Sequence, residues 1–264
     1  MLEIERLSAG HPAGRGRGRV TVVDDVSMRV DEGEIVGLVG ESGCGKTTLA
    51  RVVAGLDRPT GGVVRFAGTD VHRLRGGALR AYRRQAQLVF QDPYLSLSPR
   101  QTVRQTVAEP LVIHRVGDAR ARSARVDELL DLVGLDPAVG GRRPRQLSGG
   151  QQQRVAIARA MALGPRLLVC DEPVTALDVS VQATVLNLLA DLRDRFGLAC
   201  LFISHDLAVV RQLANRVAVM RAGRIVEQGP TLEVTATPRH PYTRALLAAT
   251  PTIDTGPRPA SRRR

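Results

Sequence analysis

The residues best suited to chemistry form the stretch GESGCGKT at positions 40 to 47, with the spacing G-x-x-x-x-G-K-T. Its glycines allow positive φ angles and bring successive backbone N–H groups close around an anion. Lys46 can reach the terminal phosphates of a nucleotide, and the Thr47 hydroxyl can ligate Mg²⁺. We therefore predict a nucleotide site on this loop. The residues expected to hold the nucleotide here are Gly40, Ser42, Gly43, Cys44, Gly45, Lys46, Thr47 and Thr48.

Lys46 stands out because the chain has 38 Lys and Arg residues in total and Lys46 is the single lysine among them. A compact ammonium can fold over a loop-bound phosphate, whereas a guanidinium is larger and differently hydrated. The alternative interpretation is a Gly-rich turn before a helix. An apolar strand at 35–39 and a helix from Lys46 give the order strand, loop, helix, which favours the nucleotide site.

Two acids follow a second apolar strand, in the stretch LLVCDE at 167–172. Asp171 is placed to hold Mg²⁺ through water, as the acidic part of a phosphate-loop site does. Glu172 is then free to orient or deprotonate an attacking water. An acidic pair that caps a strand end is the alternative, and the phosphate loop in the same chain favours the catalytic interpretation.

The stretch LSGGQ at 147–151 precedes a helical run. Ser148 can cap that helix, and Gly149 and Gly150 expose N–H groups ahead of Gln151, which makes a second anion-binding helix start. One nucleotide cannot occupy both the phosphate loop and this second anion-binding helix start. We therefore expect Ser148, Gly149, Gly150 and Gln151 to serve the nucleotide of a partner.

Composition limits the classes of protein that this chain can belong to. At 264 residues, with 43% hydrophobic and 24% charged residues, it suits one large globular domain or a core with a subdomain. No apolar run approaches the roughly 20 residues that cross a bilayer, and the beginning lacks a basic-then-apolar leader, so we expect a cytoplasmic protein. Three scattered cysteines argue against a disulfide scaffold or a metal cluster.

A formal charge of +12 raises the hypothesis of a nucleic-acid partner. Aromatic residues make up only 3% of the chain and Trp is absent, so the stacking platforms of single-strand binders are missing. We expect no nucleic acid. A basic surface that faces anionic lipid headgroups, or ATP itself, is the interpretation we favour.

Strands and helices alternate along much of the chain, which predicts an α/β fold with a mostly parallel sheet covered on both faces. Gly40, Gln91, Asp171 and His205 each follow directly after such a strand, so they should meet at one edge of the sheet. The expected strands span 2–7, 20–30, 35–39, 63–66, 87–90, 166–170, 199–204 and 216–220. The expected helices lie around 78–84, at 179–196 and at 207–213. An amphipathic helix with Val126, Leu129, Leu130 and Val133 on one face is expected to end at Gly134.

These motifs, in this order, resemble the ATP-binding subunit of ABC transporters. They are GESGCGKT at 40–47, Gln91, LSGGQ at 147–151, LLVCDE at 167–172, Ala176-Leu-Asp178 and His205. The resemblance implies a RecA-like phosphate-loop core at 1–92 and 164–235 with an N-terminal antiparallel β part. It also implies a helical subdomain at 93–163 that carries LSGGQ, and a C-terminal tail at 236–264 whose last residues are disordered.

The resemblance further implies a working unit of two such subunits, packed head to tail, with ATP and Mg²⁺ as cofactors. Each ATP lies between one phosphate loop and the other subunit's LSGGQ. Glu172, His205 and Gln91 are the catalytic residues implied, with Gln91 sensing Mg²⁺ and His205 binding the γ-phosphate. Asp178 helps the two sites communicate. Read alone, His205 would be an ordinary histidine at a helix start.

Two stretches are similar to the oligopeptide, dipeptide and nickel importer ATPases: VFQDPYLSLSPRQTV, and RHPYTRALLAATP near the end. This similarity implies import of peptides or nickel-type substrates through transmembrane permease subunits, at the cytoplasmic face of the membrane. An extracytoplasmic substrate-binding protein and a second ATP-binding subunit, identical or different, are also implied. The residues of the tail by themselves predict only a short amphipathic helix.

One position departs from the family pattern. The family stacks adenine on an aromatic residue after the first strand, where this chain offers only His11. Imidazole stacks more weakly, so selectivity between ATP and GTP stays open. Two other classes share some of these motifs: a soluble ABC-type ATPase that acts on nucleic acid or ribosomes, and a phosphate-loop kinase. The soluble ATPases usually carry tandem ATPase units, coiled coils or zinc modules, none of which is visible in this sequence. A phosphate-loop kinase has no reason to carry LSGGQ.

Overall fold

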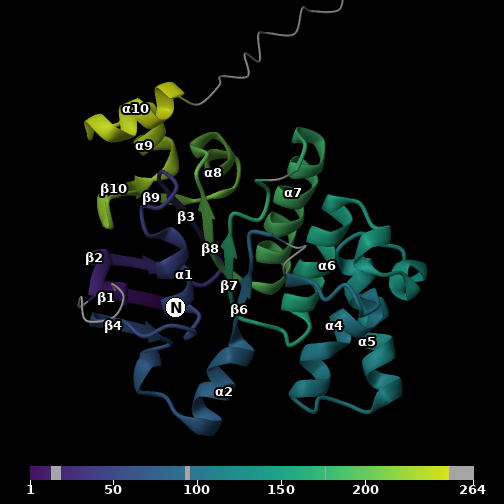
Figure 1. The fold of residues 1–264 in the computed structure, drawn as a ribbon. Helices are drawn as coiled ribbons and strands as arrows, with labels where there is room; N and C mark the ends of the chain where they lie inside the picture. The colour runs from purple at the N-terminus through teal and green to yellow at the C-terminus, as the bar shows by residue number, and fades with distance from the viewer. Residues whose placement is uncertain (13–18, 93–95, 176, 250–264) are drawn as a thin grey trace, which may run out of the picture.

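The computed structural model describes residues 1–12, 19–92, 96–175 and 177–249. Residues 250–264, which include the last residues of the tail that were expected to be disordered, and Ala176 of the predicted motif lie outside the described ranges. Two sheets and the helices around them make up the described part of the chain (Figure 1). No helix in that part is both long and apolar enough to cross a bilayer.

Within the described ranges, the larger sheet has six strands in the order β10-β9-β3-β8-β7-β6. All neighbouring strands from β9 to β6 pair in parallel, and β10 pairs antiparallel with β9 at one edge. The mostly parallel sheet predicted from the sequence is therefore confirmed. Its strands are β3 (Ile35–Val39), β6 (Ala86–Val89), β7 (Leu167–Asp171), β8 (Ala199–Ser204), β9 (Arg216–Arg221) and β10 (Arg224–Pro230).

The smaller sheet is antiparallel, in the order β2-β1-β4-β5. Its strands are β1 (Leu2–Pro12), β2 (Arg19–Val30), β4 (Gly61–Phe66) and β5 (Thr69–Asp70). The predicted first strand at 2–7 was too short, because β1 continues to Pro12. Register shifts between Ile4 and Gly10 break the apolar alternation there, so pairing with β2 extends the strand where the sequence pattern fades.

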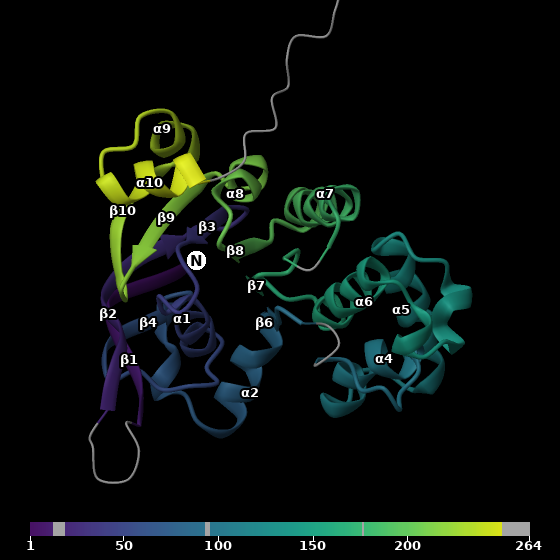
Figure 2. The ribbon, with the colours of Figure 1, turned by 45° about the horizontal axis from the view of Figure 1, so that its top comes forward.

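Helices cover both faces of the larger sheet. They are α1 (Lys46–Val53), α2 (Gly76–Gln85), α4 (Val103–Ile113), α5 (Ala119–Leu132), α6 (Gly149–Met161), α7 (Val179–Phe196), α8 (Leu207–Leu213), α9 (Thr231–Ala236) and α10 (Pro241–Ala249). Helices α4, α5 and α6 pack together to one side of the sheets, as Figure 2 shows. Helix α5 corresponds to the predicted amphipathic helix, with Val126, Leu129 and Leu130 buried on one face, and it ends at Leu132, with Val133 as the C-cap.

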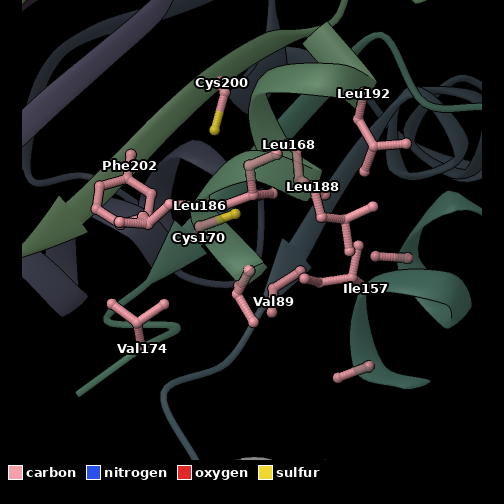
Figure 3. Close-up of a cluster of buried hydrophobic side chains, with 14 of the residues drawn as sticks. Val89, Ile157, Leu168, Cys170, Val174, Leu186, Leu188, Leu192, Cys200 and Phe202 are labelled. Carbon is pink, nitrogen blue, oxygen red and sulfur yellow. The ribbon is translucent and has the colours of Figure 1, made fainter. Parts of the chain in front are cut away.

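The apolar core has two layers, one on each face of the larger sheet. Alternate residues of β8 point to opposite layers: Phe202 packs with α6 and α7, and Leu201 packs against α1. Figure 3 shows part of the first layer, where Leu168 and Phe202 from the sheet meet Leu186 from α7. Helix α1 lies between the two sheets, so apolar side chains fix it from both sides. The loop before α1 is thereby held in place.

The C-terminal part of the fold was only partly predicted. Strand β10 and helix α9 follow the last strand expected from the sequence and had no prediction. Helix α10 fits the short helix predicted for the tail. In Figures 1 and 2 this yellow helix lies beside α9, close to β10. The tail therefore packs on the core as a defined element up to residue 249.

Candidate functional site

The phosphate-loop motif folds as a tight loop between β3 and α1, as its spacing predicts. Glycine is required at Gly40, because a Cβ there would lie 2.2 Å from the backbone oxygen of Met220. Gly45 has a φ of 111°, a backbone conformation that residues with a side chain rarely adopt. A Cβ at this position would lie 2.6 Å from the backbone oxygen of Val22. The loop is thus shaped by close backbone approach from β2 and β9.

Lys46 is folded back over this loop and is 4% exposed. Its Nζ donates to the carbonyl oxygens of Gly40 at 2.7 Å and Glu41 at 2.9 Å. The nearest carboxylate oxygen, Oε1 of Glu172, lies 3.6 Å from Nζ. The Lys46 ammonium therefore lies over the loop, beside Glu172, the acid predicted to act as the catalytic base.

Glu172 is the residue on which the predicted catalytic groups converge. Its Oε2 accepts from Gln91 Nε2 at 3.2 Å and from Thr175 Oγ1 at 3.2 Å, and His205 Nδ1 lies 3.1 Å away. Its side chain is 12% exposed, which strengthens these contacts. The structure therefore brings Gln91, Glu172 and His205 together at the edge of the sheet where the sequence placed them.

The backbone of Glu172 has an unusual conformation, with a φ of 47°. A residue other than glycine costs about 1–2 kcal/mol in this left-handed region. The Glu172 N–H donates to the oxygen of Ile203 at 3.0 Å, which ties the turn to β8. This turn directs the Glu172 carboxylate back toward Lys46 instead of letting it continue along β7.

Asp171, the last residue of β7, is buried beside the loop. Burial raises the pKa of its carboxyl, as does the charge of Glu172, while the Thr47 hydroxyl and Lys46 oppose the shift. Its Oδ1 is buried and has no hydrogen-bond partner among the described residues. A buried carboxylate oxygen without a partner is costly, and a hydrated divalent cation beside Thr47 would satisfy it.

The raised pKa of Asp171 gives a testable consequence for stability. Above that pKa the ionised carboxylate costs folding free energy, and the cost disappears below about pH 3.9, the ordinary aspartate pKa. Asp171→Asn should therefore raise the melting temperature of the nucleotide-free chain at neutral pH. Thermal melts should show this gain shrink as the pH approaches 4. An equal gain at both pH values, or the same gain for the exposed Asp194→Asn, would contradict this origin.

The cavity around the loop has a volume of about 700 Å³, which suits a nucleotide-sized ligand. Its lining residues are His11, Val22, Glu41, Ser42, Gly43, Gly45, Lys46, Thr47, Thr48, Gln91, Glu172, Thr175, His205 and Leu246. Three residues predicted for this site, Gly40, Cys44 and Asp171, are buried and do not line the cavity. Burial raises the pKa of the Cys44 thiol, and the Cys44 N–H closes the turn onto Glu41 O at 3.3 Å.

Four lining residues were not predicted: Val22, Glu41, Thr175 and Leu246. Val22 and Leu246 reach the cavity from β2 and α10, so only the tertiary fold could reveal them. Glu41 and Thr175 lie within or beside predicted motifs and carried no signal of their own. His11 was predicted, and its Nε2 lies 3.2 Å from Thr48 Oγ1.

The second predicted anion-binding site, at the start of α6, lies outside this cavity, because Ser148 is not among the lining residues. Asp178 does not line the cavity either. Ser148 Oγ accepts from Gln151 N at 3.3 Å, and Gln151 Oε1 accepts from Ser148 N at 2.9 Å, which caps α6. Gly150 has a packing role, because a Cβ there would lie 2.2 Å from Val181 Cγ1. Asp178 caps α7 by accepting from Val181 N at 2.9 Å.

Comparison with known families matched two parts of the chain. A family model described as ABC transporter matches residues 23–175. A second model, described as oligopeptide/dipeptide transporter, C-terminal region, matches residues 226–264. The first match includes the phosphate loop and the two acids, and the second includes α10.

Among curated proteins, a probable peptide ABC transporter ATP-binding protein of Sinorhizobium fredii is 50% identical over 259 residues. That alignment covers 96% of this chain and 73% of the relative. A putative oligopeptide transport ATP-binding protein of Bacillus subtilis is 48% identical over 255 residues, which covers 96% and 77%. A glutathione import ATP-binding protein of Pectobacterium atrosepticum is 48% identical over 259 residues, which covers 96% and 42%.

Solved structures share the fold. An ATP-binding cassette, solved as a dimer in a post-hydrolysis state bound to ADP and Pi, superposes with a TM-score of 0.79 at 30% identity. The match covers 88% of this chain and 99% of that one. A Clostridium perfringens chain that is part of an ABC transporter complex superposes with a TM-score of 0.79 at 28% identity, covering 89% and 90%.

Proposed function

This chain belongs to the ABC transporter family, and from that premise we propose that it is the ATP-hydrolysing subunit of a peptide importer. The convergence of Lys46, Gln91 and His205 on the Glu172 carboxylate carries the proposal. The import of peptides is supported by the names of the relatives and by the match of the C-terminal region. Nickel-type substrates are the second candidate class of substrate, because the subfamily that the sequence resembles also includes nickel importers. Nothing found in the structure or the comparisons favours a nucleic-acid or ribosome ATPase.

The residues of the loop suit the binding of ATP. Backbone N–H groups at the start of α1 and the Lys46 ammonium would hold the phosphates, with the base near His11. Mg²⁺ would be held by Thr47, Gln91 and Asp171. The buried Oδ1 of Asp171, which has no hydrogen-bond partner among the described residues, supports this set. Bound there, the cation would neutralise charge on the β- and γ-phosphates. The described residues contain no group of three or more His, Cys, Asp and Glu side chains that could form an all-protein cage, and Mg²⁺ in nucleotide sites needs none.

Hydrolysis needs a base for the attacking water, and Glu172 is the carboxylate best placed for that role. The water oxygen bonds to the γ-phosphorus, its proton passes to Glu172, and the bond to the bridging oxygen breaks to release ADP and phosphate. The contacts from Gln91 and Thr175 fix the carboxylate in advance. His205, at 3.1 Å from Glu172, is placed to contact the γ-phosphate. These contacts reduce the reorganisation that the reaction requires.

A second subunit would complete each site. The start of α6, with Ser148, Gly149 and Gln151, lies outside the cavity of its own chain, as does Asp178. We therefore assign the start of α6 to the nucleotide of the other subunit, and Asp178 to communication between the two sites. The dimeric cassette among the solved structures supports this arrangement. Both a homodimer and a heterodimer are compatible with it.

Membership of the ABC transporter family also suggests how the chain is divided. We propose residues 1–92 and 164–235 as the ATP-binding core, 93–163 as the helical subdomain and 236–264 as the C-terminal tail. The packing of α4, α5 and α6 beside the sheets supports the subdomain (Figure 2). The chain would act at the cytoplasmic face of the membrane, bound to permease subunits that receive substrate from an extracytoplasmic binding protein.

A groove between the core and α4 is the proposed contact with the permease. Leu56, Phe90 and Ile113 line it and are 45%, 42% and 65% exposed, respectively. Such exposed apolar side chains in one groove are typical of a protein contact. Phe90 directly precedes Gln91 in the chain. A partner that moves this groove would therefore move Gln91 at the ATP site.

Ile113→Asp is expected to weaken the association of this chain with its permease subunits by at least about tenfold, because it places a charge in a desolvated contact. The matched control is Val112→Asp, which changes an exposed apolar neighbour that does not line the groove. Co-purification from membranes measures the association, and ATP binding by the isolated chain should stay unchanged in both variants. Equal retention of the permease by the two variants would exclude this groove as the contact.

A further inference from the structure

The C-terminal helix contacts the phosphate loop directly. The Tyr242 hydroxyl, on α10, accepts a hydrogen bond from the backbone N–H of Glu41 at 3.1 Å, across 201 positions of the sequence. The Tyr242 side chain is buried, with 6% exposed. Leu246, one helical turn further on, lines the nucleotide cavity. The tail is therefore part of the wall around the loop.

Tyr242 acts on a particular peptide group, the one that joins Gly40 to Glu41. The oxygen of this peptide accepts from Lys46 Nζ at 2.7 Å, and its N–H donates to Tyr242. Because a peptide group is planar and rigid, contacts at both ends fix its orientation. The Tyr242 hydroxyl and the Lys46 ammonium thus hold the first peptide of the loop between them.

Tyr242 is itself held in place. The guanidinium of Arg221, at the end of β9, lies 5.0 Å from the centre of its ring. The Tyr242 N–H donates to His240 Nδ1 at 3.1 Å. The carboxylate of Glu227, on β10, accepts from the N–H groups of Arg239 at 2.8 Å and His240 at 3.0 Å. The hydroxyl therefore sits on a rigid support that reaches back to the larger sheet.

We propose that Tyr242 is a positioning residue for the phosphate loop, which makes the C-terminal helix a determinant of nucleotide affinity. The inference rests on the proposed function, because it concerns the ATP site. A phosphate loop must hold several N–H groups toward one anion, and a loop that is ordered in advance binds more tightly than one ordered by the ligand. Tyr242 supplies part of that order from outside the loop.

Tyr242→Phe tests the inference, since it removes the hydroxyl and keeps the ring that packs beside Arg221. We expect the dissociation constant and the KM for ATP to rise about three- to tenfold, the effect of one buried hydrogen bond, with kcat within about twofold of the parent. Arg244→Ala, at an exposed position of the same helix, is the control and should match the parent. Binding is measured by titration with a fluorescent ATP analogue, and turnover by phosphate release.

A packing role alone would give a different pattern. If Tyr242→Phe bound ATP as well as the parent and only Tyr242→Ala were weakened, the hydroxyl would have no positioning role and the inference would be overturned. A fall in kcat at unchanged KM would overturn it as well. If the parent chain itself bound no ATP, the proposed function would fail first, so the two failures are distinguishable.

Discussion

A Glu172→Gln variant is expected to bind ATP like the parent and to lose about 10²- to 10⁴-fold of its turnover, the usual effect of removing a general base. The amide keeps the length and an oxygen that can accept from Gln91 and Thr175, so these two contacts survive, whereas the ion pair with Lys46 is lost. It cannot take a proton from water at neutral pH. Phosphate release measures the turnover, and equilibrium titration measures the binding.

The control for this change is Glu128→Gln, an exposed glutamate on α5 outside the site, which should behave as the parent. Turnover of the Glu172 variant within about threefold of the parent would exclude this carboxylate as the base. Loss of ATP binding would instead mean that Glu172 mainly orders the loop through Lys46, 3.6 Å away. The two results separate catalysis from site assembly.

The same variant reports on pairing, because ATP that is not hydrolysed should hold two subunits together. Light scattering should therefore detect a dimer of the Glu172→Gln chain with ATP, or with a different ATP-binding subunit if the natural pair is mixed. Ser148 caps α6 and does not line the cavity of its own chain, and we assign this helix start to the nucleotide of a partner. A loaded variant that pairs with neither would contradict the shared site.

Local patterns were enough to predict much of the fold. The helices at 179–196 and 207–213 and the strand at 199–204 have the bounds read from the sequence. Asp178 and Asp206 cap the two helices through their own side chains, and such signals lie within a few residues of the boundary. Gln91 and His205 meet at Glu172, the residue after Asp171, because the parallel strands that precede them end at one edge of the sheet.

Contacts between distant segments could not be predicted in this way. Strand β10 exists through its pairing with β9, and its residues alternate poorly between buried and exposed. Tyr242 meets Glu41 only because the tail folds back over the core, and no local pattern records such a contact. Gly150 is a second case that the sequence pattern explained only in part. The motif indicated that this glycine exposes its N–H group, but close packing against Val181 is a separate reason for a glycine there.

Lys46→Ala should weaken ATP binding by about 10- to 100-fold, the range expected when a charge-assisted contact is lost. The variant also leaves the carbonyls of Gly40 and Glu41 without their donor, which loosens the loop. Lys46→Arg should not restore affinity, because a planar guanidinium is too large to fold over the loop as the buried ammonium does. Titration of each variant with ATP measures this, and parent-like affinity in the Ala variant would refute the site.

Because Lys46 is the single lysine, its chemistry can be followed in the unaltered protein. An amine-reactive reagent should label only Lys46 and the N-terminal amine, and Lys46 should react slowly because it is 4% exposed. ATP should slow this reaction further by engaging the ammonium with phosphate, while labelling of the N-terminus stays constant and serves as the internal control. Peptide mass spectrometry separates the two positions. Labelling of Lys46 at the same rate with and without saturating ATP would show that phosphate binds elsewhere.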